Sequence, residues 1–123
     1  MQNHVPLKLA EAFHTLEALY PGRVDLGIGR APGTDPTTSR ALRPFSPAQF
    51  TEQLNEMTGM SGATLGGDHP FKSVRVVPAG VELPPIWLLG SSGASAELAG
   101  AMGLGYSFAS HFSPAPAAPA LDA

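Results

Sequence analysis

The spacing of apolar residues predicts a first helix over residues 6–20. Four large apolar residues recur there at helical intervals and form one face: Leu9, Phe13, Leu16 and Tyr20. Pro6 suits the first turn, where its missing N–H has no helical partner to lose, and Pro21-Gly22 ends the helix. His14 lies beside the apolar face, so we expect it to be partly exposed.

Two further helices follow from the same periodicity. One covers about residues 46–60, begins at Ser46-Pro47, and places its core residues at intervals of four and three: Phe50, Leu54 and Met57. The other is rich in alanine, covers about residues 92–102, and ends at Gly103.

Alternating or continuous apolar runs predict four strands. They are residues 23–29, residues 71–78 as an edge strand or hairpin arm, residues 86–90, and residues 105–112. The run IWLLG (86–90) is typical of a strand buried on both faces, with Trp87 and later Phe108 in the core. Strands alternating with helices at this spacing indicate an α/β fold with a parallel sheet.

The remaining segments are expected to lie outside this pattern. Residues 30–39 and 61–70 are dense in turn formers and are predicted to be loops. Residues 113–123 are a Pro/Ala-rich tail, predicted to be disordered, which leaves residues 1–112 as the folded domain.

Composition excludes several classes of function. Seven Lys and Arg against ten Asp and Glu give a net charge of −3, which provides no basic surface for nucleic acid or an anionic membrane. The chain has no cysteine, so disulfides, thiolate nucleophiles and cysteine metal sites are absent. No apolar run is long enough for a membrane helix, and the N-terminus does not resemble a secretory signal. We therefore expect a cytoplasmic protein.

One candidate binding segment is RVDLGIGRAPGTD (23–35). Its glycines allow close approach of a ligand, and Arg30 comes where a strand ends, which is where parallel α/β folds bind ligands. The alternative from the residues alone is that the glycines only shape a tight turn, with Arg30 solvated or paired with Asp35.

The second candidate is IWLLGSSGAS (86–95). A strand that ends in Gly-Ser-Ser-Gly and opens a helix offers free N–H groups to a phosphate, and three serines could add hydroxyl donors: Ser91, Ser92 and Ser95. The alternative is that Ser91 or Ser92 simply caps the helix.

Other reactive side chains give weaker signals. The GSSG sequence lacks the spacing of a nucleophile elbow, and the four histidines show no metal-binding spacing. His4 and His111 come near predicted strand ends, and His111 is a weak catalytic candidate. Catalytic residues otherwise stay unassigned, and no metal site is expected.

Residues 3–35 and 85–112, with GRAPGTD and WLLGSS, resemble the luciferase-like monooxygenases. That resemblance implies an incomplete (β/α)8 TIM barrel that binds reduced FMN at the carboxyl ends of its strands. It further implies a cofactor-binding set: Asn3, Arg30, Gly90, Ser91, Ser92 and Ser95. FMN is expected ahead of a deazaflavin, and the implied partners are a flavin reductase, molecular oxygen and a small organic substrate.

The chain also departs from the family pattern. A whole barrel needs about 250 residues, and the resemblance is expected to stop at Phe112, because the Pro/Ala tail resembles nothing in the family. The expected function is thus a truncated flavin-dependent monooxygenase, a flavoprotein oxidoreductase with little or no activity by itself. Two alternatives are a non-catalytic fragment that self-associates through open sheet edges or complements another chain, and a small phosphate-binding module.

Overall fold

The computed structural model describes residues 3–42 and 46–111. Its elements are α1 (Pro6–Leu19), β1 (Leu26–Gly29), α2 (Pro36–Ala41), α3 (Pro47–Gly62), β2 (Ile86–Gly90), α4 (Gly93–Met102) and β3 (Gly105–Phe108). The predicted tail lies outside the described residues. The chain forms two compact units, residues 1–24 with 30–84 and residues 25–29 with 85–123.

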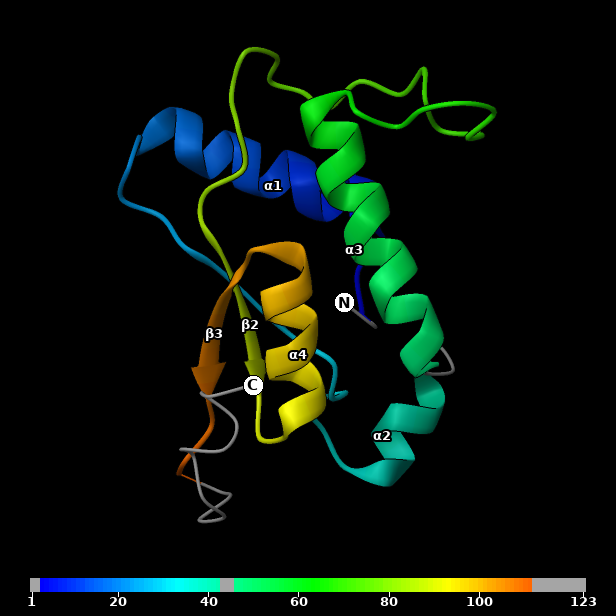
Figure 1. The fold of residues 1–123 in the computed structure, drawn as a ribbon, viewed down its shortest axis with the longest axis vertical. Coiled ribbons are helices and arrows are strands. Elements are labelled where there is room, and N and C mark those ends of the chain that lie inside the picture. Colours follow the sequence, from blue (N-terminus) through cyan, green and yellow to red (C-terminus); the bar gives the residue numbers. More distant parts are fainter. Residues whose placement is uncertain (1–2, 43–45, 112–123) are drawn as a thin grey trace. The chain divides into compact units, whose positions relative to one another are not determined.

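The second unit contains the sheet. Its three strands lie in the order β1-β2-β3 and are all parallel, and α4 packs on β2 and β3 (Figure 1). This confirms the predicted α/β fold with parallel strands, and it is the strand–helix–strand order of a (β/α)8 barrel.

The two faces of this sheet differ in cover. Ile28 pairs with Leu88, and both are buried on the face toward α4. Trp87 and Leu89 point to the opposite face and are 41% and 42% exposed. The prediction of a strand buried on both faces, with Trp87 in the core, is therefore wrong, because α4, the helix of this unit, covers the other face. Phe108, also predicted to be core, is only half-buried.

Glycines flank the exposed side chains. A Cβ at Gly105 would lie 2.6 Å from the Trp87 ring, and a Cβ at Gly27 would lie 3.2 Å from Leu89. Each large side chain thus lies across a neighbouring strand that has no side chain at that position. We call the face formed by Gly27, Trp87, Leu89 and Gly105 the open face.

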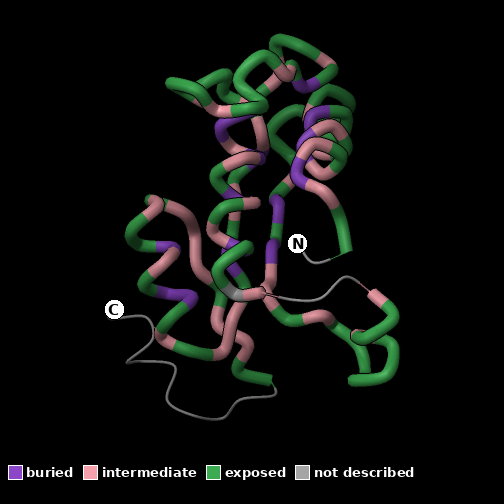
Figure 2. Tube along the Cα trace, turned by 90° about the vertical axis from the view of Figure 1, so that its right-hand side faces the viewer, coloured by how far each residue is buried: buried purple, intermediate pink, exposed green. Residues whose placement is uncertain are grey.

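The first unit is built on α1 and α3, which pack on each other (Figure 2). The predicted core face of α3 is confirmed, since Phe50, Leu54 and Met57 are almost fully buried. The predicted face of α1 is wrong: Leu16 and Tyr20 are exposed, and the buried positions are Pro6, Ala10 and His14. Small and polar residues let α1 approach its neighbours closely on that side.

His14 is only 2% exposed, which corrects the expectation of a surface residue. Its Nδ1 lies 3.1 Å from the Pro78 carbonyl oxygen and its Nε2 lies 2.7 Å from the Ser61 hydroxyl. A carbonyl can only accept, so Nδ1 donates, and in the neutral ring Nε2 accepts from the Ser61 hydroxyl. Both ring nitrogens of this buried histidine therefore have hydrogen-bond partners.

Two other local predictions are wrong. Residues 71–78 form no strand: residues 71–73 are a turn, residues 74–76 have no regular structure, and residues 77–78 are a bend. Lys72 and Arg75 donate side-chain hydrogen bonds to nearby backbone carbonyls there, which favours local turns over pairing with another strand. Residues 30–39, predicted to be a loop, contain the start of the short helix α2.

Candidate phosphate-binding site

The start of α4 leaves its backbone N–H groups unoccupied by capping side chains. β2 ends at Gly90 and α4 begins at Gly93, so only Ser91 and Ser92 connect them. Ser92 is the N-cap, with extended backbone angles, but its hydroxyl makes no capping hydrogen bond. The alternative that Ser91 or Ser92 caps the helix is thus correct for the position of Ser92 but not for a capping bond from its side chain. The first N–H groups of a helix have no intrahelical partner; here the Ser95 N–H donates to the Ser92 carbonyl at 3.3 Å, which leaves those of Gly93 and Ala94 as the candidate donors.

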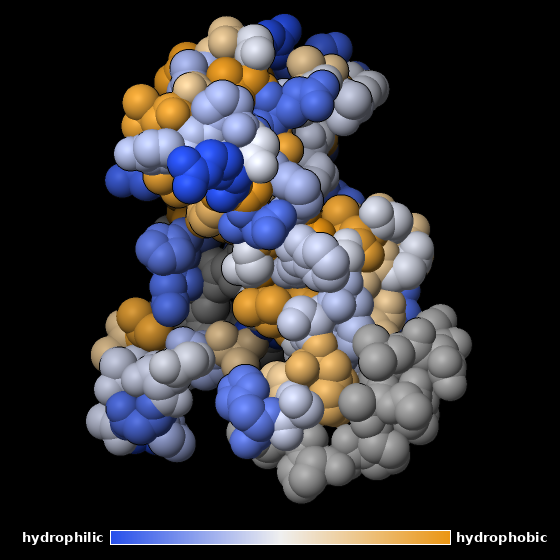
Figure 3. Space-filling view, turned by 90° about the vertical axis from the view of Figure 1, so that its left-hand side faces the viewer, coloured by the Kyte–Doolittle hydropathy of each residue, from blue (hydrophilic) through white to orange (hydrophobic). Residues whose placement is uncertain are grey.

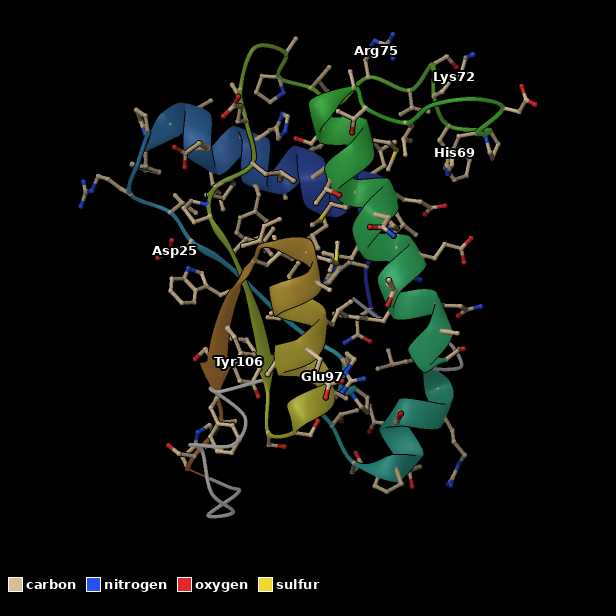
Figure 4. All side chains as sticks on the ribbon, in the orientation of Figure 1. Asp25, His69, Lys72, Arg75, Glu97 and Tyr106 are labelled. Atoms are coloured by element: carbon tan, nitrogen blue, oxygen red, sulfur yellow. The ribbon has the colours of Figure 1, made fainter. Side chains whose placement is uncertain are left out.

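The charge distribution at this helix end favours an anion. The first turn of α4 contains no acidic residue, so no carboxylate within that turn opposes the partial positive charge of the helix N-terminus. Glu97, labelled on α4 in Figure 4, comes later in the helix and is exposed.

Gly90 and Ser95 pack tightly against each other. Ser95 is 4% exposed, and a Cβ at Gly90 would lie 2.7 Å from both its Cβ and its Oγ. Only glycine fits at this position without moving α4. Ser95 is thereby held at the carboxyl end of β2, beside Ser91 and Ser92, which we call the serine turn. No hydrogen bond from its hydroxyl to another described residue is present.

The structure brings part of the predicted set together. Gly90, Ser91, Ser92 and Ser95 belong to one unit and surround the end of β2. Asn3 and Arg30 belong to the other unit, so their convergence with the serines stays a prediction. Arg30 is half-buried and directly follows β1, and Asn3 is exposed just before α1.

Asp35 in GRAPGTD has a structural role that the sequence analysis missed. It caps α2 by accepting hydrogen bonds from the backbone N–H groups of Thr37 and Thr38, and also from the Thr38 hydroxyl. These bonds, the Thr38 hydroxyl first, lower the pKa of Asp35 from 3.8 to about 2. Asp35 is thus engaged by threonines, and its pairing with Arg30 is not what the described residues show. Asp35-Pro36 was the available signal, an N-cap residue followed by proline.

Two histidines remain as candidates. His4 and His111 are exposed. Within residues 3–42 and 46–111, no group of three or more His, Cys, Asp or Glu could hold a metal ion. In the same part of the chain, no helix has the length and apolar character needed to cross a membrane.

Tyr106 is a site residue that sequence reasoning missed. Its hydroxyl donates to the Ser92 carbonyl oxygen at 3.2 Å, so it reaches the serine turn from β3. The available signal was a tyrosine in a strand next to the turn, since a half-buried tyrosine usually finds a partner for its hydroxyl.

Comparison with known proteins decides the family. The model of the family described as luciferase-like monooxygenase matches residues 1–123. The chain belongs to the luciferase-like monooxygenase family. The match includes residues 113–123, so the resemblance does not stop at Phe112 as the sequence analysis expected.

Individual relatives agree with this membership. The chain is 52% identical over 125 residues to a Bacillus subtilis protein named YvbT and 47% identical over 117 residues to a luciferase-like monooxygenase of Escherichia coli K12. Among solved structures, apo-MsnO8 matches with a TM-score of 0.77 at 38% identity.

These matches cover nearly all of this chain but only part of each relative. They include 99%, 93% and 97% of this chain, and 36%, 34% and 35% of YvbT, the Escherichia coli protein and MsnO8. The chain therefore spans about a third of the length of the relatives that it matches.

Proposed function

We propose that the start of α4 binds the phosphate of a flavin, and that this chain supplies the phosphate end of the cofactor site in a luciferase-like monooxygenase. The observation that carries the proposal is the serine turn at the end of β2, which opens a helix with no capping side chain and no acidic first turn. A phosphate dianion matches these donors and the charge of the helix end.

The residues present fit such a group. Backbone N–H groups at Gly93 and Ala94 and the hydroxyls of Ser91, Ser92 and Ser95 are the proposed ligands. Nothing lies within 4 Å of an added Cβ at Gly93, so the backbone is uncrowded on that side. Arg30 and Asn3 join the proposal on the family resemblance, and Arg30 is supported by its place directly after β1.

The proposed cofactor is reduced FMN delivered by a flavin reductase, and a deazaflavin is the alternative. The bound flavin would supply the electrons that activate molecular oxygen for transfer to a small organic substrate. The part of this chain in that reaction is to hold the phosphate and so to fix the position of the cofactor.

The test compares FMN with riboflavin, which has the same ring system and no phosphate. We expect the chain to bind FMN more tightly than riboflavin in fluorescence titrations. Inorganic phosphate provides a third arm: equally tight binding of phosphate and FMN would favour the simple phosphate-binding module over a flavin site.

Two substitutions at Ser92 make the test specific. Asp and Asn are both good N-cap residues, so S92D and S92N should keep α4 folded. Only S92D places a negative charge beside the phosphate, and we expect it to bind FMN at least about tenfold more weakly than S92N. Equal FMN affinity of the two variants would contradict an anion site at this helix end.

A second candidate function is self-association through the sheet. The open face leaves Trp87 and Leu89 exposed, and apolar side chains also reach the surface in several places on the side drawn in Figure 3. β1 and β3 are edge strands of the described sheet, and open edges pair with other strands. We propose that a second copy of this chain covers this face.

Trp87 is the only tryptophan, so its fluorescence reports on the open face directly. We expect its emission to shift to shorter wavelength as protein concentration rises, together with a larger mass in light scattering. L89S should weaken this shift, and L19S, which changes a residue that is 65% exposed on α1, is the control. A concentration-independent spectrum from a monomer would contradict the proposal.

A further inference from the structure

The serine turn is held by two hydrogen bonds from the segment that includes β3. The Tyr106 hydroxyl donates to the Ser92 carbonyl at 3.2 Å, and the Ala109 N–H donates to the Gly90 carbonyl at 2.8 Å. Both carbonyls that bracket Ser91 and Ser92 are therefore bonded from the β3 side, and the Ser92 carbonyl also accepts the Ser95 N–H of α4 at 3.3 Å. All of these residues belong to the same compact unit.

Tyr106 reaches the turn because of its register. It pairs with Leu88, whose side chain is buried, so Tyr106 is placed on the helix-covered side of the sheet. Its ring edge passes close to Gly90, with Cε2 3.6 Å from the position of an added Cβ there. Figure 4 shows Tyr106 on β3, next to α4. Because Gly90 has no side chain, there is room for the tyrosine ring to pass it and reach Ser92.

The direction of the carbonyls sets the direction of the N–H groups. In a planar trans peptide, the C=O and the N–H of the next residue point in opposite directions. The carbonyls of Gly90 and Ser92 point toward β3 and Ala109. The N–H groups of Ser91 and Gly93 therefore point away from β3. Those two N–H groups are among the donors that an anion at the start of α4 would use.

We infer that Tyr106 is a positioning residue for phosphate binding: its hydroxyl fixes the Ser92 carbonyl and thereby aims the Gly93 N–H at a phosphate monoester. The inference rests on the proposed function. Tyr106 acts through the turn without touching the phosphate, because its hydroxyl already donates to Ser92.

The test uses Y106F in the whole chain, with FMN and riboflavin as probes. Phenylalanine keeps the ring that packs against Gly90 and removes only the hydroxyl. We expect FMN binding to weaken about threefold to tenfold, as for the loss of one hydrogen bond, and riboflavin binding to stay unchanged. The control is Y20F, because Tyr20 is the only other tyrosine and lies 53% exposed at the end of α1.

Amide hydrogen exchange adds a readout without ligand. The Ser95 N–H, which donates to the Ser92 carbonyl at 3.3 Å, should exchange faster in Y106F than in the wild-type chain, because that carbonyl loses its bond from Tyr106, and Y20F should show no change. Unchanged exchange at Ser95 would overturn the inference.

The outcomes separate the inference from the function on which it rests. If Y106F weakens FMN and riboflavin equally, Tyr106 has a general structural role and the inference fails. If the wild-type chain prefers FMN and Y106F keeps that preference, the inference fails and the proposed function stands. If the wild-type chain shows no preference for FMN over riboflavin, the proposed function fails and the inference fails with it.

Discussion

Gly90 and Ser95 pack closely against each other at the carboxyl end of β2. Because Ser95 is buried against the strand, the residue at position 90 cannot carry a side chain without displacing the first turn of α4. The geometry of the serine turn therefore depends on the absence of a side chain at position 90.

Gly90→Ala should destabilise the chain by about 1–3 kcal/mol, the usual cost of overpacking. Its added Cβ would lie 2.7 Å from Ser95, so the start of α4 must move. Urea unfolding measures the change. Gly100→Ala is the matched control, because Gly100 is an exposed helical position with nothing within 4 Å of an added Cβ, and it should stabilise by up to about 1 kcal/mol. Equal stabilities of the two variants would contradict the tight packing at Gly90.

Asp35 makes stability depend on pH in the acid range. Its pKa in the folded chain, about 2, lies below its ordinary value of 3.8. The unfolded chain therefore binds the proton more readily, and the stabilisation from this carboxylate is complete above the ordinary pKa and lost as the pH falls through about 2. The stability difference between the wild-type chain and D35N should shrink between those two pH values.

The carboxyl carbon shift of Asp35, followed by NMR through an acid titration, gives the midpoint directly. A midpoint at the ordinary value would show that the threonine hydrogen bonds do not cap α2 in solution.

At the residue scale, the sequence identified the serine turn but not what holds it. A strand followed by Gly-Ser-Ser-Gly is local information, and the turn lies where it was predicted. Tyr106 is fourteen residues from Ser92 and His14 is 47 residues from Ser61. Contacts across such separations depend on strand register and helix packing, which a single sequence does not encode visibly.

At the element scale, His14 connects three segments. It lies on α1 and bonds to Ser61 on α3 and to the carbonyl of Pro78 in the segment before β2. Both partners are remote in sequence, so this one ring joins the helices to the connection that leads back to the sheet.

His14→Phe keeps a ring of similar shape but leaves the Pro78 carbonyl and the Ser61 hydroxyl without their partner. We expect a loss of about 2–4 kcal/mol in unfolding free energy, because unsatisfied buried polar groups are costly. Thr15→Ala is the control, since its neighbouring hydroxyl bonds only within α1 and is exposed. A loss for H14F no larger than that for T15A would contradict the connecting role of His14.

Helices and strands differed in how well the sequence predicted them. The ends of α1, α3 and α4 follow proline and glycine signals and were predicted to within about three residues. Residues 71–78 were predicted as a strand from their apolar residues, but they form no strand and instead carry local bonds from Lys72 and Arg75 to backbone carbonyls. α2 was missed because its six residues are too few for a periodic pattern.

At the scale of the whole molecule, the alternation of elements was enough to predict a parallel sheet. Periodicity could not tell which face of β2 a helix covers, because IWLLG is apolar at every side chain before its glycine. The exposure of Trp87 and Leu89 is a property of the assembled strands. The convergence of Asn3 and Arg30 with the serine turn likewise stays a prediction, since Asn3 and Arg30 belong to one compact unit and the serines to the other.

The most direct measurement is a pair of amide NMR titrations of the whole chain, one with FMN and one with riboflavin. The account predicts that FMN moves the amide signals of Ser91, Ser92, Gly93 and Ala94 strongly, because the phosphate accepts hydrogen bonds from this turn, and that riboflavin leaves them nearly unchanged. Equal effects of the two flavins on these amides, or no effect of either, would contradict a phosphate site at the start of α4.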